Sequence, residues 1–565
     1  MVGVAVFLIL NFLLFIPRYV FNTKTAAFLP IKEFFPKGKL RIQPLFTRFN
    51  EDVFRLNWEY AFIFLVLYLG KNQIPIGYAK GIVGVLYLFT LLLFFYHNTI
   101  YAIYKSYPSL RVDYRLIVQG VQIALSGFKG YFFLGCIAFI SLCYFVILGN
   151  FYIVEVLYSD SFLLPIGFAL IVLTGILYSL YKKVNPFQFK KEFEFEIQHF
   201  ATIQWSIALL SSNRFFGVKS KEELTQIPNL IADTIIKVPE NLALKSKPNV
   251  YFIAIESYGA ILYENETYAE KYKTLIRKLE QKLESRNLKS ATTLSETTVT
   301  GGTSWVSFSS FLKGIKIKND FTYRYLLNHQ KECKTQSVFS ILKAFGYDTY
   351  LVAGIGGFES LTIEWEKILS FLGTEKAIKY ADLEYKGATF NFGPSAPDQY
   401  LLNKARNLME EKSNGKPFAF FVETINSHYN FDTPTQLLSN WEDCQTARRE
   451  DFKPLQNLSE QVLENYFKAI EYQLNNLEDF ISNDNESDSI YVVFGDHQPP
   501  LITHSKNSYK TPIHVISKEK KLVEQLIEKG FDYGLLTELG ANKFNFSHAD
   551  FKKVFVGLFI NTYSQ

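Results

Sequence analysis

Residue types able to bind a metal ion recur at the ends of apolar segments in the C-terminal part of this 565-residue chain. Glu256 follows one such segment, Glu423 another with His428 a little beyond, and Asp496 and His497 follow a third. Carboxylates and imidazoles are suitable ligands for divalent ions such as Mn²⁺, Mg²⁺ or Zn²⁺. Any one of them could instead cap a helix or belong to a turn. Their recurrence at three segment ends favours a metal site.

The stretch Ser295–Ile315 offers a nucleophile for the same site. Gly301 and Gly302 lead directly into Thr303 and Ser304, and an apolar run with small residues follows. Glycine permits a sharp turn and a close approach of substrate, and the residues after it can open a helix whose free amides attract an anion. By itself the stretch is more typical of an ordinary turn. Next to a metal site, it predicts a hydroxyl group that faces a phosphate or a sulfate.

Alternating apolar and helical segments, from Pro248 onward, must position these groups. The pattern is typical of an α/β domain whose mostly parallel sheet is covered on both faces. In such sheets the functional groups collect at the carboxyl ends of the strands. The expected strands are Asn249–Ile255, Thr349–Ala353, Phe418–Val422 and Ile490–Phe494, and the expected helices are Tyr268–Glu284, Gln336–Phe345, Asp398–Glu411 and Ser459–Ile481.

Apolar segments of another kind fill the first third of the chain. Each approaches the length needed to cross a bilayer core of roughly 30 Å, and tyrosine and tryptophan cluster at their ends. The first lacks the basic start and small-residue cleavage site of a signal peptide, so we expect it to be retained. The five segments lie near Val2–Val20, Tyr60–Gly70, Gly81–Tyr101, Gly130–Leu148 and Ser161–Tyr181, and the second is marginal.

Length and composition divide the chain into parts. A chain of 565 residues is too long for one compact domain. We expect a transmembrane domain at 1–181, a juxtamembrane linker at 182–247 and an α/β domain at 248–565. The net charge of +5 is mild, and the chain has no lysine- and arginine-rich block. We therefore exclude nucleic acid as a partner.

The basic residues of the loops conflict with export of the C-terminal domain. Lysine and arginine are frequent between Arg18 and Arg55, recur near Lys105 and Arg115, and follow the last apolar segment at Lys182. The positive-inside rule would place these loops, and the C-terminal domain with them, in the cytoplasm.

Four motifs resemble those of a known family. IAIESY at Ile253–Tyr258, GTSWVSF at Gly302–Phe308, NSHYNF at Asn426–Phe431 and FGDHQP at Phe494–Pro499 are similar to motifs of lipoteichoic acid synthases and related phosphoglycerol or phosphoethanolamine transferases. These enzymes belong to the alkaline phosphatase/sulfatase superfamily. The resemblance implies about five transmembrane helices followed by an α/β alkaline phosphatase/sulfatase-like domain. It also implies a multi-pass protein of the cytoplasmic (inner) membrane with its catalytic domain outside, which we weigh above the charge of the loops.

The resemblance also assigns roles to individual residues. It implies that Glu256, Thr303, Asp496 and His497 bind one divalent metal, with Mn²⁺ favoured and Mg²⁺ or Zn²⁺ as alternatives. Thr303 would also be the nucleophile, because a metal-bound hydroxyl loses its proton more easily. His428 matches a histidine that contacts the substrate phosphate and can protonate the leaving oxygen.

The resemblance implies a transferase that moves a phosphoglycerol or phosphoethanolamine group from a membrane phospholipid to a glycan or lipid acceptor through a phospho-threonine intermediate. Ser304 remains the second choice for the nucleophile, and Trp365 is a loose match to a headgroup-binding tryptophan. Two alternatives stay open: a phosphate or sulfate ester hydrolase, and a catalytically silent membrane protein that binds a glycan. A disulfide between Cys333 and Cys444 also stays open, since spacing alone cannot show proximity.

Overall fold

The structure is a computed structural model that divides into two compact units, Met1–Lys221 and Glu222–Gln565, and each unit is considered separately. The boundary falls inside the predicted linker, and the predicted domain limits stay predictions. The described residues are 2–21, 57–104, 108–110, 113–114, 117, 121, 129–159, 162–181, 206, 210, 218–239, 241–356, 365–391, 395–429, 431–455, 462–484, 488–499, 502–503, 509–537 and 546–565.

The first unit contains a helix at each of the five apolar segments. Two of them are long and apolar enough to cross a membrane, over Ile76–Ile100 and Phe132–Tyr158, while the apolar parts described for the other three are shorter. The described residues therefore support two candidate spans, and the predicted five are not confirmed. The helices are α1 (Val2–Phe21), α4 (Trp58–Leu69), α5 (Ile76–Tyr104), α7 (Lys129–Tyr158) and α8 (Leu163–Tyr181).

The second unit is built on one sheet of eight strands in the order β4-β3-β5-β1-β6-β7-β2-β8. The five strands from β4 to β6 run parallel to one another, and β7, β2 and β8 follow with antiparallel pairings. The strands are β1 (Val250–Ile255), β2 (Lys289–Glu296), β3 (Asp348–Val352), β4 (Lys376–Ile378), β5 (Phe418–Glu423), β6 (Ile490–Gly495), β7 (Lys510–Ser517) and β8 (Asp532–Tyr533).

The sheet is therefore mixed, whereas the sequence predicts a mostly parallel one. The four predicted strands correspond to β1, β3, β5 and β6, all in the parallel part. Only 14 residues separate β6 from β7, and such a short connection favours antiparallel pairing because a parallel partner needs a longer crossover. Since β7 is antiparallel to both β6 and β2, strand β2 runs in the same direction as β6 and ends at the same edge.

Alternate side chains of the central strand enter two separate cores. Tyr251, Ile253 and Ile255 pack in one core and Val250 and Phe252 in the other, and all are almost fully buried. A strand buried on both faces reads as a continuous apolar run, which is the pattern seen in the sequence.

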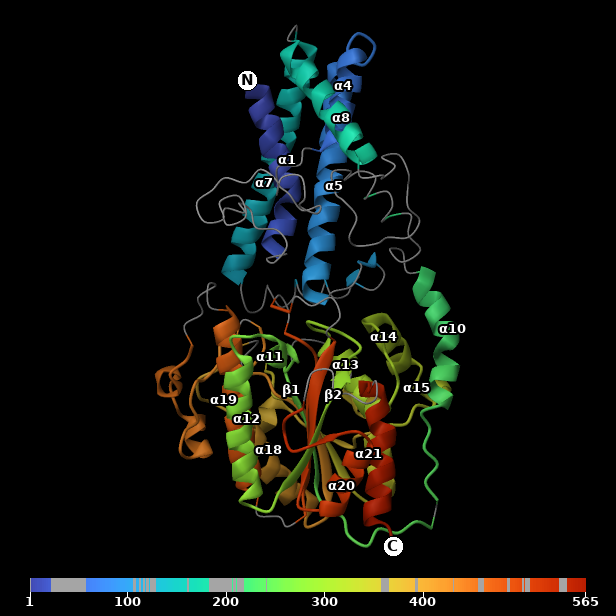
Figure 1. The fold of residues 1–565 in the computed structure, drawn as a ribbon, viewed down its shortest axis with the longest axis vertical. Helices are drawn as coiled ribbons and strands as arrows, with labels where there is room; N and C mark the ends of the chain where they lie inside the picture. Colours follow the sequence, from blue (N-terminus) through green and yellow to red (C-terminus); the bar gives the residue numbers. More distant parts are fainter. Residues whose placement is uncertain are drawn as a thin grey trace. The chain divides into compact units, whose positions relative to one another are not determined.

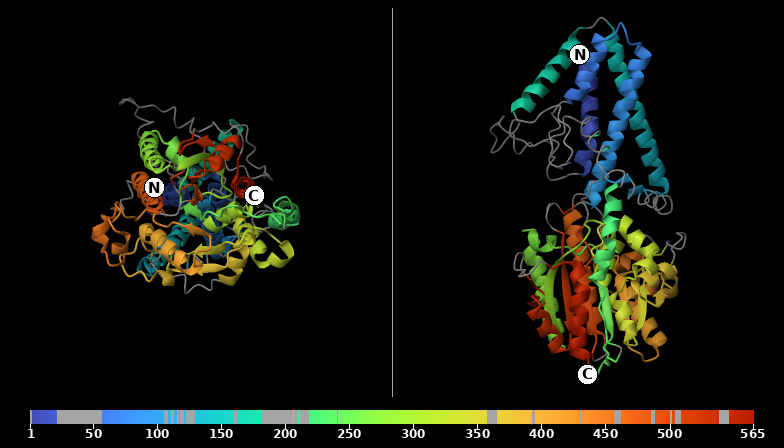
Figure 2. Two further views of the ribbon diagram at one scale, coloured as in Figure 1. Left: turned by 90° about the horizontal axis from the view of Figure 1, so that it is seen from below. Right: turned by 90° about the vertical axis from the view of Figure 1, so that its right-hand side faces the viewer.

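Helices cover both faces, as Figure 1 shows and as Figure 2 shows from two further directions. The core that contains Tyr251 includes side chains from α11 (Ile261–Glu264), α12 (Ala269–Glu284), α18 (Asp398–Ser413) and α19 (Val462–Ser482). The core that contains Val250 includes side chains from α10 (Val218–Ala232), α13 (Ser304–Lys313), α14 (Asp320–Asn328), α16 (Val338–Ala344), α17 (Trp365–Leu372), α20 (Lys520–Glu528) and α21 (His548–Tyr563). Helix α15 (Gln330–Cys333) lies between α14 and α16 in the chain. Short 3₁₀ helices are formed by Tyr380–Leu383, Trp441–Gln445 and Arg449–Phe452.

Candidate metal centre

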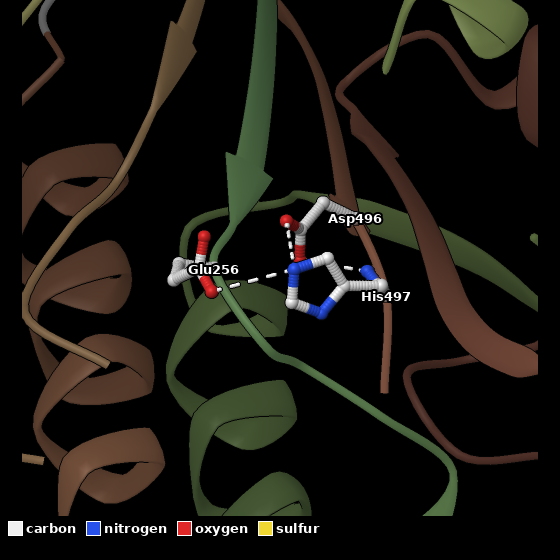
Figure 3. A group of neighbouring side chains, drawn as sticks. All are labelled: Glu256, Asp496 and His497. Carbon is white, nitrogen blue, oxygen red and sulfur yellow. Dashed lines mark hydrogen bonds and ion pairs between the residues drawn. The ribbon is translucent and has the colours of Figure 1, made fainter. Parts of the chain in front are cut away.

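Three side chains meet at the carboxyl edge of the two central strands. Glu256 follows β1, and Asp496 and His497 follow β6, whose last residue pairs with the last residue of β1. The three side chains point toward one another in Figure 3. His497 Nε2 lies 3.2 Å from Asp496 Oδ2 and 3.6 Å from Glu256 Oε1. Potential ligand atoms of all three lie within 4.8 Å of one another, which is the spacing of groups that share one ion.

The imidazole of this cluster directs its Nε2 atom at the carboxylates. His497 Nδ1 lies 2.9 Å from the carbonyl oxygen of Gln498, and because a carbonyl only accepts, Nδ1 is the protonated nitrogen. In the neutral ring, Nε2 is then unprotonated. Asp496 is 0% exposed, and its Oδ2 makes no hydrogen bond within the described part of the chain. A lone pair and an unpaired carboxylate oxygen at 3.2 Å need a cation between them, either a proton or a metal ion.

Backbone contacts fix the positions of the two carboxylates. Asp496 Oδ1 accepts hydrogen bonds from the backbone amides of Ser257 (2.8 Å) and His497 (2.7 Å). Ser257 has a φ of 59°, an unusual conformation for a residue with a side chain, and it also donates from Oγ to Glu256 Oε1 at 2.7 Å. A Cβ at Gly495 would come within 1.8 Å of the Tyr258 carbonyl oxygen. Only glycine therefore allows the two strand ends to approach so closely.

The hydroxyls of Thr303 and Ser304 lie at the start of α13, beside this cluster. Ser304 Oγ is 3.3 Å from Glu256 Oε2 and 3.3 Å from His497 Nε2. Thr303 Oγ1 instead donates to the carbonyl oxygen of Gly302 at 2.6 Å. The structure thus puts the Ser304 hydroxyl in contact with the cluster, whereas the Thr303 hydroxyl contacts the Gly302 carbonyl, and the predicted roles of Thr303 stay predictions.

Backbone strain marks the position of Thr303. Its φ is 59°, which is uncommon for a β-branched residue, and Gly301 and Gly302 before it also have positive φ. Strand β2 ends at Glu296 on the cluster's edge of the sheet, so the turn that follows delivers the N-terminus of α13 to the cluster. Strain of this kind persists where the surrounding structure imposes it and is frequent at functional sites.

Glu423 is a third carboxylate near this edge of the sheet. It ends β5, which pairs with β1, but it is not one of the three residues whose ligand atoms lie within 4.8 Å of one another. Its Oε1 is buried and makes no hydrogen bond within the described residues. The strand-end pattern draws attention to Glu423, but the resemblance gives it no role, and it is therefore missing from the predicted ligands.

The proximity of these groups changes their proton affinities. Burial, reinforced by Glu256, raises the pKa of Asp496 to about 7, and burial together with Asp496 and Glu256 raises the pKa of Glu423 well above its ordinary value. Burial also opposes ionisation of Glu256, but His497 and then His428 outweigh it and lower its pKa. Burial would lower the pKa of His497, yet the neighbouring carboxylates raise it. Without a bound cation, the cluster therefore retains protons near neutral pH.

His428 lies in the loop after β5, close enough to Glu256 to lower its pKa. The amide nitrogen of Asn391 holds this loop, because its Nδ2 lies 3.2 Å, 3.1 Å and 2.8 Å from the carbonyl oxygens of Ile425, Asn426 and His428. His428 is partly exposed, as a group that meets a substrate must be. Its predicted role stays a prediction.

Among the described residues, no hydrogen bond or ring contact links Trp365 to the cluster. It begins α17, packs against the core of Val250, and has the ammonium of Lys379 5.3 Å from its ring centroid. Its predicted role in substrate binding stays a prediction. Cys333 and Cys444 are both free, so the disulfide that the sequence leaves open is not formed in this structure.

The donor set suits a divalent cation. Carboxylate oxygens and an unprotonated imidazole nitrogen are ligands of Mn²⁺, Mg²⁺ and Zn²⁺, and Asp496 Oδ2 is a buried oxygen that makes no hydrogen bond within the described residues. A metal ion would supply the missing positive charge and lower the pKa of a hydroxyl bound to it.

Comparison with known proteins supports the fold. The sulfatase family model matches residues 248–528, and no curated protein sequence matches the chain. Similar solved structures include the lipoteichoic acid synthase LtaP from Listeria monocytogenes, with 17% identity, a TM-score of 0.35, and coverage of 52% of this chain and 70% of that one.

Two further structures are similar to a comparable degree. The Streptococcus pyogenes phosphoglycerol transferase GacH, in complex with sn-glycerol-1-phosphate, has 14% identity and a TM-score of 0.35, with coverage of 60% and 80%. The soluble domain of lipooligosaccharide phosphoethanolamine transferase A from Neisseria meningitidis has 16% identity and a TM-score of 0.36, with coverage of 56% and 91%. At such TM-scores these structures do not identify a substrate for this chain.

Proposed function

We propose that this chain is a metal-dependent transferase that moves a phosphoglycerol or phosphoethanolamine group from a phospholipid to a glycan or lipid acceptor, and the match of the sulfatase family model to residues 248–528 supports this proposal. The observation that carries the proposal is the meeting of Glu256, Asp496 and His497 beside the strained, hydroxyl-bearing start of α13. This arrangement combines metal ligands with a nucleophile at a helix N-terminus, where an anionic phosphate is stabilised.

In the proposed reaction, a hydroxyl oxygen at the start of α13 attacks the phosphorus of the phospholipid. The bond between phosphorus and the diacylglycerol oxygen breaks, and the headgroup phosphate remains as an ester on the protein. We assign the attack to Thr303, and to Ser304 the task of holding Glu256 and His497 through its two contacts. His428 protonates the departing diacylglycerol oxygen, while the proton of the attacking hydroxyl passes to water. In the second step His428 accepts the proton of the acceptor hydroxyl, the acceptor oxygen bonds to phosphorus, and the bond between phosphorus and the Thr303 oxygen breaks, after which Thr303 regains a proton from water.

Mn²⁺ at this site, or Mg²⁺ or Zn²⁺, would lower the pKa of the attacking hydroxyl and neutralise charge on the phosphoryl oxygens. Glu256, Asp496 and His497 would hold the ion. Trp365 is the proposed contact for the headgroup. The apolar first unit supports a membrane location, and we propose a multi-pass protein of the cytoplasmic membrane with the catalytic domain outside. Anchoring would keep the domain close to a donor that is dissolved in the membrane.

The test is release of diacylglycerol from a fluorescent phospholipid by the full chain in detergent with Mn²⁺. We expect Thr303→Ala to lower the rate by at least about 10³-fold, the effect of removing a nucleophile. Ser309→Ala is the matched control, because Ser309 lies in the same helix and its buried Oγ makes no hydrogen bond in the described part of the chain. It should retain wild-type activity. Mass spectrometry of the quenched enzyme should find the headgroup phosphate on Thr303.

Other outcomes separate the alternatives. If Ser304→Ala loses the covalent adduct while Thr303→Ala keeps it, the nucleophile is Ser304. Release of the free headgroup at the same rate with and without an acceptor identifies a hydrolase. If the wild-type chain neither binds a metal ion nor consumes any phospholipid headgroup, the transferase proposal is wrong.

A further inference from the structure

We infer that Asp398 and Asn391 are positioning residues for His428, because one binds the amide groups and the other the carbonyl oxygens of the turn that carries this histidine. This inference rests on the proposed function, in which His428 transfers protons, and it adds the groups that keep the histidine in place. Neither the family resemblance nor the comparisons assign a role to Asp398 or Asn391.

The carboxylate of Asp398 binds the first two amide groups of the turn Ile425–His428. Asp398 is the first residue of α18 and is 0% exposed. Its two oxygens each lie 3.0 Å from the Ile425 amide nitrogen, and Oδ2 lies 2.7 Å from that of Asn426. In return, Asn426 Oδ1 accepts a hydrogen bond from the Asp398 amide at 2.8 Å. Gln473 Nε2 also donates to Oδ2, so α19 helps to hold the carboxylate.

The carbonyl oxygens of the same turn face the side-chain amide of Asn391. Its Nδ2 lies within 3.2 Å of carbonyl oxygens from Ile425, Asn426 and His428. The turn itself is closed by a hydrogen bond of 3.0 Å from the His428 amide to the Ile425 carbonyl. A shift of Ile425 would therefore move His428 with it.

The loop that contains this turn is also attached to the main chain of Glu256, a proposed metal ligand. Ser427 Oγ donates to the Glu256 carbonyl oxygen at 2.7 Å, and the Glu256 amide donates to Thr424 Oγ1 at 3.3 Å. His428 follows Ser427 directly. The position of His428 relative to the metal centre therefore depends on the backbone of this loop.

The imidazole of His428 takes its tautomer from the same backbone. Its Nδ1 donates to the carbonyl oxygen of Tyr429, so in the neutral ring Nε2 is the nitrogen that accepts a proton. Proton transfer requires this nitrogen within hydrogen-bond reach of the reacting oxygen, and a displacement of about 1 Å can lower a rate about 10²-fold.

A charged group holds such a turn more firmly than a neutral one. Burial raises the pKa of Asp398 to about 6, so the carboxylate is ionised at a pH of about 7.5. Hydrogen bonds to an ionised acceptor are about twice as strong as neutral ones. Burying a carboxylate costs free energy, and a neutral side chain would satisfy the amides of an ordinary turn. The choice of a carboxylate here fits a turn whose position matters for the reaction.

The test measures diacylglycerol release by the full chain in detergent with Mn²⁺, at a pH of about 7.5. Asp398→Asn keeps the size of the side chain but leaves one oxygen for two amides. We expect it to lower kcat about 10²-fold, with a Kd for Mn²⁺ within about threefold of the wild type. Asp550→Asn is the matched control and should keep wild-type kcat, because Asp550 lies in the first turn of α21, a helix of the same length, and accepts the Ser547 amide at 2.9 Å.

Two measurements separate the positioning of His428 from a general structural role. In a His428→Ala background, Asp398→Asn should lower kcat by less than about twofold further, because the histidine that it positions is absent. With a p-nitrophenyl phosphodiester donor, the leaving nitrophenolate needs no proton, so the first turnover of Asp398→Asn should lie within about threefold of the wild type. An effect of full size in the His428→Ala background, or an equal loss with the nitrophenyl donor, would overturn the inference. So would a Kd for Mn²⁺ weakened in proportion to kcat.

A second variant tests the turn through its carbonyl oxygens. Asn391→Gly allows the φ of 59° at this partly buried position and removes the side-chain amide. It should show the same selective loss of kcat, which decides the question if unfolding temperatures show that Asp398→Asn does not fold. Wild-type kcat in either folded variant would overturn the inference. Failure of the proposed function looks different, because the wild-type chain itself would then release no diacylglycerol, and the inference would fall with it.

Discussion

Removal of the metal ion should make the stability of the α/β unit depend on Asp496. Without a cation, burial and the nearby Glu256 raise the pKa of Asp496 from 3.8 to about 7. Between these two values the native state binds more protons than the unfolded state, so stability falls as pH rises. The stabilisation that protonated Asp496 contributes is fully present below pH 3.8 and is lost above about pH 7. The shift corresponds to about 4 kcal/mol, since one pKa unit is about 1.4 kcal/mol.

The substitution Asp496→Asn isolates this contribution. The amide can still accept hydrogen bonds from the backbone amides of Ser257 and His497, but it carries no charge. In EDTA at pH 8.5, Asp496→Asn should be more stable than the wild type by up to about 4 kcal/mol, and the difference should shrink toward pH 5. For a unit the size of Glu222–Gln565, with an unfolding entropy of about 2 cal/mol/K per residue, this is a rise of about 6 °C.

Intrinsic fluorescence on heating measures the effect, because Trp305, Trp365 and Trp441 all lie in this unit. With saturating Mn²⁺ the order should reverse, since the wild type gains the free energy of ion binding and Asp496→Asn has lost a ligand. A difference between the two proteins that is the same at pH 5 and pH 8.5 in EDTA would refute the assignment of the raised pKa to Asp496. An Asp496→Asn variant stabilised by Mn²⁺ as strongly as the wild type would refute its role as a ligand.

Two further predictions concern Lys313, in the last turn of α13, and Gly495, at the end of β6. Burial lowers the pKa of Lys313 from 10.5 to about 7. Between these two pH values the native state binds fewer protons than the unfolded state, so the free energy of unfolding should rise by up to about 1.4 kcal/mol per pH unit. Lys313→Met should flatten this rise in unfolding temperatures measured at pH 7.5 and 9.5, and a slope unchanged in the variant would contradict the prediction. Gly495→Ala should destabilise the unit by about 1–3 kcal/mol and abolish the thermal shift caused by Mn²⁺, because its Cβ would collide with the Tyr258 carbonyl. Gly557→Ala, where no atom lies within 4 Å of the added Cβ, should be neutral or stabilising by up to about 1 kcal/mol, and equal losses in both variants would exclude the collision as the cause.

The sequence predicts the parallel part of the sheet because its strands are buried on both faces. Val250–Ile255 is apolar at every position, and its boundary with Glu256 is visible as an abrupt change to polar residues. The sequence pattern does not reveal strand β2, because Lys289–Glu296 has threonine and serine at buried positions. Their hydroxyl groups make hydrogen bonds in place of apolar packing, and Thr292, for example, donates to the Gly534 carbonyl. Strand β2 and its antiparallel pairings with β7 and β8 are consequently missing from the prediction.

The candidate site, like the sheet, can be predicted from the sequence only in part. Glu256, Asp496 and His497 can be predicted because each directly follows a recognisable strand, and residues at one sheet edge must lie close together. Which of two adjacent hydroxyls faces the cluster cannot be read from the sequence, because it depends on the φ of 59° at Thr303. The position of Glu423 at the same edge of the sheet depends on the adjacency of β5 and β1, which single-strand patterns do not reveal.

The placement of β1 in the centre of the sheet also has a consequence for biosynthesis. Its two neighbours, β5 and β6, are made long after it, and the contact between Ser257 and Asp496 joins residues 239 positions apart. During synthesis, the apolar strand β1 therefore remains incompletely paired until β6, the last strand of the parallel part, has been made. Such a strand is prone to pair with other chains. We expect this protein to depend on chaperones that shield β1 until β6 is available.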